Sequence, residues 1–106
     1  MIYELKKYTA HPGKFDALVQ RFADQTIPVC QRLGIEVVHC WTAPEEPGVF
    51  YYLTRFASDE ARTAAWKAFG SDPEWQQAKA QSEQDGPLLA SQSTSVLQAT
   101  PFSPHG

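Results

Sequence analysis

The sequence predicts an α+β fold in which helices cover one face of an antiparallel four-stranded sheet. Segments with the hydrophobic period of strands alternate with segments of helical period, in the order β-α-β-β-α-β. A loop rich in proline and glycine, residues 44–48, joins the second and third strands closely enough for a hairpin. The chain has 106 residues, enough for one domain with its own hydrophobic core.

The first half of the chain is expected to begin with a strand at residues 2–9, which ends at the turn sequence His-Pro-Gly, residues 11–13. A helix follows, because apolar residues recur at the spacing of one helix face: Phe15, Leu18, Val19 and Phe22. Pro28 interrupts this pattern, so it either kinks the helix or starts a short second one. Gly34 can close the helical region in a left-handed conformation.

The hairpin is expected to consist of a second strand at residues 35–42 and a third at residues 49–56. The residues that connect them, Pro-Glu-Glu-Pro-Gly, disfavour strand structure and are typical of a turn.

A second helical region is expected in two parts. Ser58 or Asp59 caps the first part, and Gly70 with Ser71 breaks it. The second part starts at the sequence Asp72-Pro73-Glu74-Trp75. The aspartate can accept hydrogen bonds from free backbone N–H groups, and proline suits the first helical position because it has no N–H to leave unpaired. The glutamate places negative charge at the positive end of the helix dipole.

The sequence Asp-Gly-Pro at residues 85–87 ends this helix near residue 84. A polar fourth strand is expected at residues 88–98, followed by a short tail at residues 100–106. Residues 1–106 therefore form a single domain, and the order of its elements is that of the ferredoxin-like, or split βαβ, arrangement.

Both faces of the predicted hairpin are apolar. In the third strand one face carries Phe50, Tyr52, Thr54 and Phe56, and strict alternation in the second gives Ile35, Val37, His39 and Trp41 on one side. Helices can cover only one face of the sheet, so the other would expose aromatic side chains to water. We expect a second copy of the chain to cover it in a homodimer. The alternative is a monomer with a wet aromatic groove.

Composition excludes several classes of partner. The net charge is −3 and no basic run occurs, which argues against nucleic acid. No apolar run is long enough to span a membrane, and the N-terminus lacks the pattern of a signal peptide. Cys30 and Cys40 are expected to be reduced thiols, as in a cytoplasmic protein. His11, His39 and His105 lack the spacing of metal ligands, so neither a metal nor another cofactor is expected.

Short motifs follow one another along nearly the whole chain. They are Met1-Ile2-Tyr3-Glu4-Leu5-Lys6-Lys7-Tyr8, Pro12-Gly13-Lys14, Gly34-Ile35 with Trp41-Thr42, Ala64-Ala65-Trp66, Asp72-Pro73-Glu74-Trp75, Gly86-Pro87-Leu88 and Phe102-Ser103-Pro104. In this order they resemble the NIPSNAP family, and the resemblance implies a dimeric α/β barrel. It implies no catalytic residue, because the family name describes a membership rather than an activity. His39, Thr54 and Lys6 depart from the family's pattern and would alter a shared pocket.

In such a dimer the uncovered sheet face becomes the interior of the barrel, where a cleft could hold a small apolar or aromatic ligand. The candidate ligand-binding residues are Glu4, Lys6, Tyr8, His39, Trp41, Tyr52, Thr54 and Phe56. His39 is the candidate general base, or else a hydrogen-bonded structural residue. Trp41 and Tyr52 would stack on the ligand, or else form the dimer core.

Two functions follow from this interpretation. The first is a homodimeric binding or accessory protein that holds a small molecule or acts through interactions. The alternative is a small cofactor-independent enzyme of the antibiotic-biosynthesis-monooxygenase type, which rests on analogy of fold.

Overall fold

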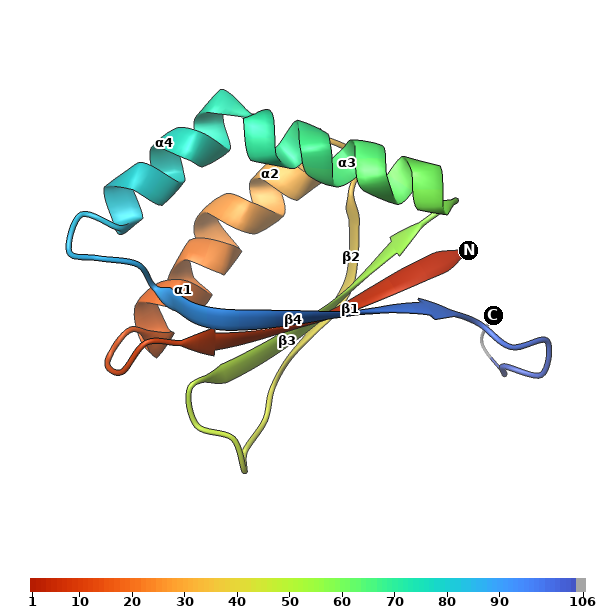
Figure 1. Cartoon of the computed structure of the whole chain (residues 1–106), viewed down its shortest axis with the longest axis horizontal. Coiled ribbons are helices and arrows are strands. Elements are labelled where there is room, and N and C mark those ends of the chain that lie inside the picture. Colours follow the sequence, from red (N-terminus) through yellow and green to blue (C-terminus); the bar gives the residue numbers. More distant parts are fainter. Residues whose placement is uncertain (105–106) are drawn as a thin grey trace.

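The computed structural model describes residues 1–104 and contains the expected four-stranded sheet, with strand order β2-β3-β1-β4. All three neighbouring pairs are antiparallel. The helices lie together on one side of the sheet, and the hairpin loop between β2 and β3 extends away from them (Figure 1). The strands are β1 (Ile2–Ala10), β2 (Glu36–Thr42), β3 (Val49–Phe56) and β4 (Leu89–Gln98).

The first helical region passes through Pro28 without a break. It consists of α1 (Phe15–Arg21), a π-helical turn η1 (Phe22–Thr26) and α2 (Ile27–Arg32). Pro28 lies in the first turn of α2, directly after the wider π turn, where its missing N–H is tolerated. Gly34 ends the region as expected, with a φ of 75° that only glycine adopts without strain.

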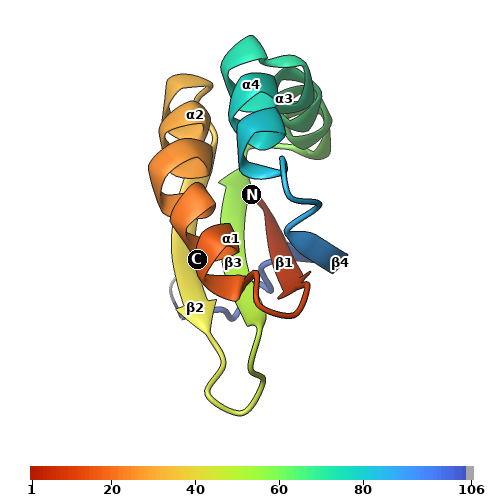
Figure 2. The same cartoon turned by 90° about the vertical axis from the view of Figure 1, so that its left-hand side faces the viewer.

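The second helical region consists of α3 (Asp59–Ser71) and α4 (Pro73–Ser82), which lie beside the first region over the same sheet face (Figure 2). Ser58 is the cap of α3, since its hydroxyl accepts a hydrogen bond from the Ala61 N–H at 3.1 Å. Asp72 caps α4 as the sequence predicts, by accepting from the Trp75 N–H at 3.0 Å.

The core lies between the helices and the sheet face that they cover. One cluster joins α2 and the end of β3 to α3, and it contains Val29, Cys30, Ile35, Phe56 and Phe69. A second cluster joins η1 to β3 and contains Phe22, Phe50 and Tyr52. The helices therefore cover the face of β3 that carries most of its aromatic side chains.

The expectation that Tyr52, Thr54 and Phe56 lie on the uncovered face is wrong, because all three are buried beneath the helices. In β1 the residues that share this covered face are Glu4, Lys6 and Tyr8, which pair with Thr54, Tyr52 and Phe50. Both faces of β3 are apolar in sequence, so alternation alone does not say which one the helices cover. The open face instead carries Tyr3, Leu5, Lys7, Tyr51, Leu53 and Arg55.

A bulge in β2 corrects a second expectation. The register shifts between Val37 and His39, which leaves Val38 as an extra residue opposite β3. The shift places His39 and Trp41 on the open face, opposite Leu53 and Tyr51. Val37 and Trp41 therefore lie on opposite faces of the sheet, where strict alternation predicts the same face.

Residues 99–104 continue beyond β4 and away from the helices (Figure 1). The side chain of Phe102 is 83% exposed there. His105, which belongs to the predicted tail, lies outside the described residues. No helix within residues 1–104 has the length and apolar character that crossing a membrane requires.

Candidate functional site

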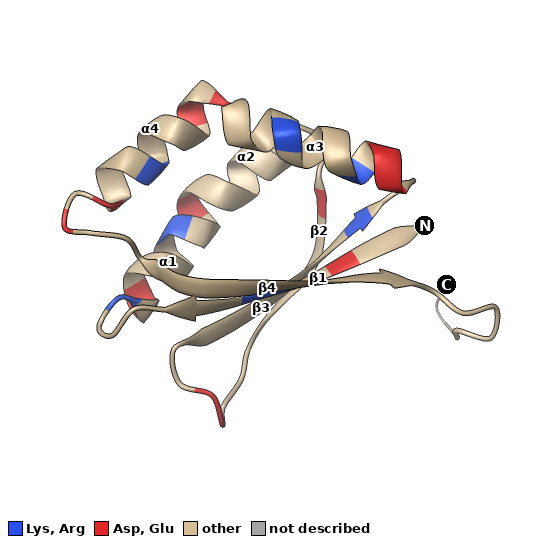
Figure 3. Cartoon of the chain, viewed as in Figure 1, with Lys and Arg blue, Asp and Glu red and all other residues tan. Residues whose placement is uncertain are grey.

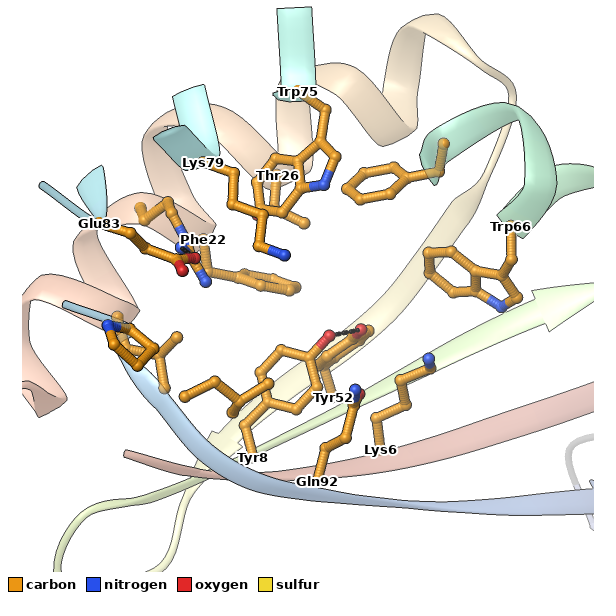
Figure 4. Close-up of a pocket in the computed structure, with 15 residues that line it drawn as sticks. Lys6, Tyr8, Phe22, Thr26, Tyr52, Trp66, Trp75, Lys79, Glu83 and Gln92 are labelled. Atoms are coloured by element: carbon orange, nitrogen blue, oxygen red, sulfur yellow. Dashed lines mark hydrogen bonds and ion pairs between the residues drawn. The ribbon is translucent and has the colours of Figure 1, made fainter. Parts of the chain in front are cut away.

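A pocket of about 410 Å³ lies between the covered face of the sheet and the two helical regions. Strands β1, β3 and β4 form its floor through Lys6, Tyr8, Tyr52 and Gln92, while η1, α3 and α4 supply its upper wall (Figure 4). The pocket exists because the helices bridge the sheet at a distance that their aromatic side chains fill only in part.

Two tyrosines form the centre of the floor. The hydroxyl oxygens of Tyr8 and Tyr52 are 2.7 Å apart, and their rings meet edge to face with centroids 5.2 Å apart (Figure 4). Burial raises the pKa of both phenols above the ordinary value of 10.0. Both hydroxyls are therefore neutral at physiological pH, so the pair can donate and accept hydrogen bonds but does not supply a base.

Aromatic rings form most of the wall. Phe22 packs on the Tyr52 ring with centroids 4.6 Å apart, and Phe69 lies between two indoles. Its ring centroid is 5.6 Å from that of Trp66 and 4.8 Å from that of Trp75. Such surfaces favour a flat apolar molecule, because aromatic rings stack on one another with little loss of conformational freedom.

Arg21 and Glu83 form a nearly buried ion pair at the side of the pocket. The Arg21 Nη1 atom donates to Glu83 Oε2 at 2.8 Å and to Ser82 Oγ at 3.1 Å. The guanidinium also lies over the Trp75 ring, 5.2 Å from its centroid. Through these contacts Arg21 connects α1 to the end of α4 and packs against the indole of Trp75.

Lys6 lies at the other side of the pocket, where it is mostly buried. Its ammonium is 4.5 Å from the centroid of the Trp66 ring and 3.4 Å from Glu4 Oε1. The Glu4 carboxylate also accepts a hydrogen bond from Arg62 Nη1 at 2.7 Å. Among the described residues, neither the buried Glu4 Oε1 nor the buried Trp66 Nε1 has a hydrogen-bond partner. The Glu4 carboxylate is thus shared between two cations.

The structure divides the candidate residues into three groups. Lys6, Tyr8 and Tyr52 line the pocket. Three others lie on the same sheet face but are buried outside the pocket lining: Glu4, Thr54 and Phe56. His39 and Trp41 lie on the open face, with ring centroids 4.8 Å apart. The candidates do not form one cluster, and the candidate base His39 lies across the sheet from the tyrosine pair.

Sequence reasoning missed the pocket residues that come from the helices, above all Arg21, Trp75, Lys79 and Glu83. A signal for Arg21 was available, since it follows Leu18 by three residues and so lies on the apolar face of its helix. A charged residue at such a position needs a buried partner, and Glu83 provides it.

The open face presents a second surface of interest. The strand registers align Leu5, Leu53 and His39 in one row across it, and Lys7, Tyr51 and Trp41 in the next. Trp41 is 43% exposed. In the part of the chain that the structure describes, no three His, Cys, Asp or Glu residues gather as metal ligands would.

Comparison with known proteins places the chain among proteins of the same fold. The sequence model of the NIPSNAP family matches residues 3–104. An uncharacterised NIPSNAP domain protein from Burkholderia xenovorans superposes with a TM-score of 0.83 at 20% identity, over 98% of this chain and 99% of that one. A NIPSNAP family protein from Agrobacterium tumefaciens gives 0.84 at 20% identity, over 99% and 98%.

The fold also resembles that of an antibiotic biosynthesis monooxygenase, with a TM-score of 0.67 at 10% identity over 95% of this chain and 100% of that one. No curated protein has a significantly similar sequence. At these identities the solved structures establish the fold, whereas chemistry has to be argued from the pocket itself.

Proposed function

The chain belongs to the NIPSNAP family, and from that premise we propose that it is a homodimeric protein that binds a small apolar or aromatic molecule beneath its helices. Each protomer holds its own ligand, because the sheet separates the pocket from the open face through which the two copies would pair. Both cysteines are free thiols, which supports the cytoplasm as its compartment.

The pocket is the observation that carries this proposal. Its volume of about 410 Å³ falls within the range of small-molecule sites, and its walls combine aromatic rings with a few polar groups. The Tyr8 and Tyr52 hydroxyls provide a hydrogen-bonding point in an otherwise apolar floor.

The open face supports the homodimer. The helices leave Leu5, Leu53 and Tyr51 uncovered, with Trp41 and Leu97 exposed at the flanking strands. Pairing this face with that of a second copy would remove an apolar patch from water. Because the pocket lies on the other side of the sheet, dimerisation and ligand binding use different surfaces.

A cofactor-independent enzyme is the second candidate, and the enclosed tyrosine pair is the observation that favours it. A neutral phenol facing a ligand-sized space can act as a proton donor. Among residues 1–104, however, no histidine lines the pocket, and the raised tyrosine pKa values make both phenols poor bases at neutral pH. These features favour binding over base-catalysed turnover.

Native mass spectrometry tests both parts of the proposal, since it reports the oligomer mass together with any small molecule retained from purification. A dimer with one bound molecule per protomer is the expected result. Binding of 2-naphthol, followed through quenching of tryptophan fluorescence, then tests the location. Gln92→Trp should abolish this binding by filling the pocket floor, because Gln92 projects into it from β4.

Gln98→Trp is the matched control, since it makes the same change on the same sheet face but outside the pocket lining. It should leave binding unchanged. Equal binding by wild type and Gln92→Trp would place the ligand elsewhere, and absence of any bound molecule or probe would overturn the proposed function.

A further inference from the structure

The charges that line the pocket do not balance. Among residues 1–104, three cationic residues line it, Lys6, Arg21 and Lys79, whereas Glu83 is the one acidic residue in its lining. Glu83 is already engaged, because Arg21 donates to it at 2.8 Å. The pocket therefore carries a surplus of positive charge, although the chain as a whole has a net charge of −3.

Lys79 holds most of this surplus. Within residues 1–104 its side chain has no ion pair or hydrogen bond, whereas Lys6 lies beside Glu4. Figure 4 shows the Lys79 side chain descending from α4, with its ammonium directed toward the hydroxyls of Tyr8 and Tyr52. The Lys79 side chain is exposed to solvent and also lines the pocket, so its ammonium is available to a ligand that enters there.

The surrounding groups add donors rather than acceptors. Lys6 contributes a second ammonium. Its neighbour Glu4 also pairs with Arg62, which in turn pairs with Asp59. The neutral Tyr8 and Tyr52 pair has one hydroxyl proton to donate beyond the bond between them. A ligand that matches this pocket therefore has a flat apolar body and an acceptor-rich, negatively charged group.

From this arrangement we propose that the ligand is an aromatic or similarly flat organic acid, whose anionic group is bound by the Lys79 ammonium while its apolar body lies against Phe22 and Trp75. The inference rests on the proposed function and specifies the class of ligand. Figure 3 shows Lys and Arg interspersed with Asp and Glu on the helices. The helices therefore do not form a general basic surface that would attract anions without the pocket.

Two probes of nearly the same shape test the charge. The anion 2-naphthoate and the neutral 2-naphthamide are titrated into the purified protein at pH 7, with tryptophan fluorescence and calorimetry as readouts. We expect 2-naphthoate to bind about tenfold more tightly, because a charge-assisted hydrogen bond to an ammonium is stronger than a neutral one. Lys79→Gln should remove this preference and leave the affinity for 2-naphthamide unchanged.

Lys67→Gln is the matched control, because Lys67 is exposed on α3 and does not line the pocket. It makes the same change in net charge and should keep the preference for the anion. Equal affinities of wild type for both probes would overturn the inference while leaving the pocket's function standing. A preference for the anion that survives in Lys79→Gln would also overturn it, and binding of neither probe would overturn the proposed function as well.

Discussion

At the scale of single residues, Asp72 shows how one side chain can join two elements. Its carboxylate caps α4 through the Trp75 N–H and accepts two hydrogen bonds of 2.7 Å from Arg32 Nη2 at the end of α2. The cap was predictable because it depends on local sequence. The Arg32 contact was not, since 40 residues separate the two partners.

The Asp72 carboxylate should make stability depend on pH. The hydrogen bonds from Arg32, followed by the one from the Trp75 N–H, lower the pKa of Asp72 below its ordinary value of 3.8. A lowered pKa in the folded state means that the ionised carboxylate stabilises the fold above that ordinary value. This contribution is lost as the pH falls through the lowered pKa.

Asp72→Asn keeps a capping side chain but removes the charge, so it should lower the melting temperature modestly at pH 7. The difference from wild type should shrink as the pH falls below 3.8. Thermal unfolding followed by circular dichroism between pH 2.5 and 7, roughly the range in which carboxyl groups titrate, measures it. Asp85→Asn, at an exposed turn, is the control; a pH-independent difference for Asp72→Asn would contradict the assigned ion pair.

The hydrogen bond between Tyr8 and Tyr52 should appear as coupling between two substitutions. Tyr8→Phe or Tyr52→Phe should each cost about 1 kcal/mol of unfolding free energy, because each leaves the other hydroxyl without its partner. The double variant should cost little more than either single one, since both remove the same bond. Urea unfolding measures all four proteins, and strictly additive costs would mean that the bond contributes nothing.

At the scale of elements, the sequence predicts the order and approximate bounds of the strands and helices, because caps, glycines and hydrophobic period are local signals. It does not predict the bulge at Val38, because no glycine or proline marks it. That single extra residue moves His39 and Trp41 to the open face, and it separates them from the candidate residues of β1 and β3. The candidate site was therefore predicted only in part.

The positions of the two thiols lead to a testable prediction, and that of Cys40 depends on the bulge. The bulge places Cys40 opposite Tyr52 on the covered face, where burial raises its thiol pKa, and burial raises that of Cys30 to about 11. Only the thiolate reacts with iodoacetamide, so both should be alkylated far more slowly in the native protein than in urea at pH 8. Cys40, which is less buried, should react before Cys30.

Mass spectrometry of the alkylated protein gives the rates, and the variants Cys30→Ala and Cys40→Ala assign them to residues. Reaction of Cys40 at the same rate in native and unfolded protein would place its side chain on the open face and contradict the bulge.

At the scale of the whole molecule, the sheet has two apolar faces with different uses. The covered face contains the core and the pocket, while the open face keeps Leu5, Leu53 and Trp41 near water. The sequence predicts that a second layer is needed on the open face but not which residues face it. The choice depends on how the helices pack over the sheet, and strand periodicity is the same for either choice.

If the open faces pair in a homodimer, Trp41 becomes a buried contact and its replacement should weaken the dimer. Trp41→Lys should raise the dimer dissociation constant by at least about tenfold, because a buried indole is commonly among the strongest contacts of an interface and a lysine would bury a charge there. The fold should survive, since Trp41 is already exposed in the single chain. Sedimentation at micromolar concentration measures the assembly, and circular dichroism checks the fold.

Ala64→Lys, at an exposed position of α3 on the far side of the molecule from the open face, is the control and should remain a dimer. Melting temperature adds an independent measure, because that of a dimer rises with protein concentration whereas that of a monomer does not. A wild-type monomer whose melting temperature does not depend on concentration would contradict the homodimer and leave the open face exposed to water. The row of Leu5, Leu53 and His39 would then stay in contact with water, while the pocket across the sheet would be unaffected.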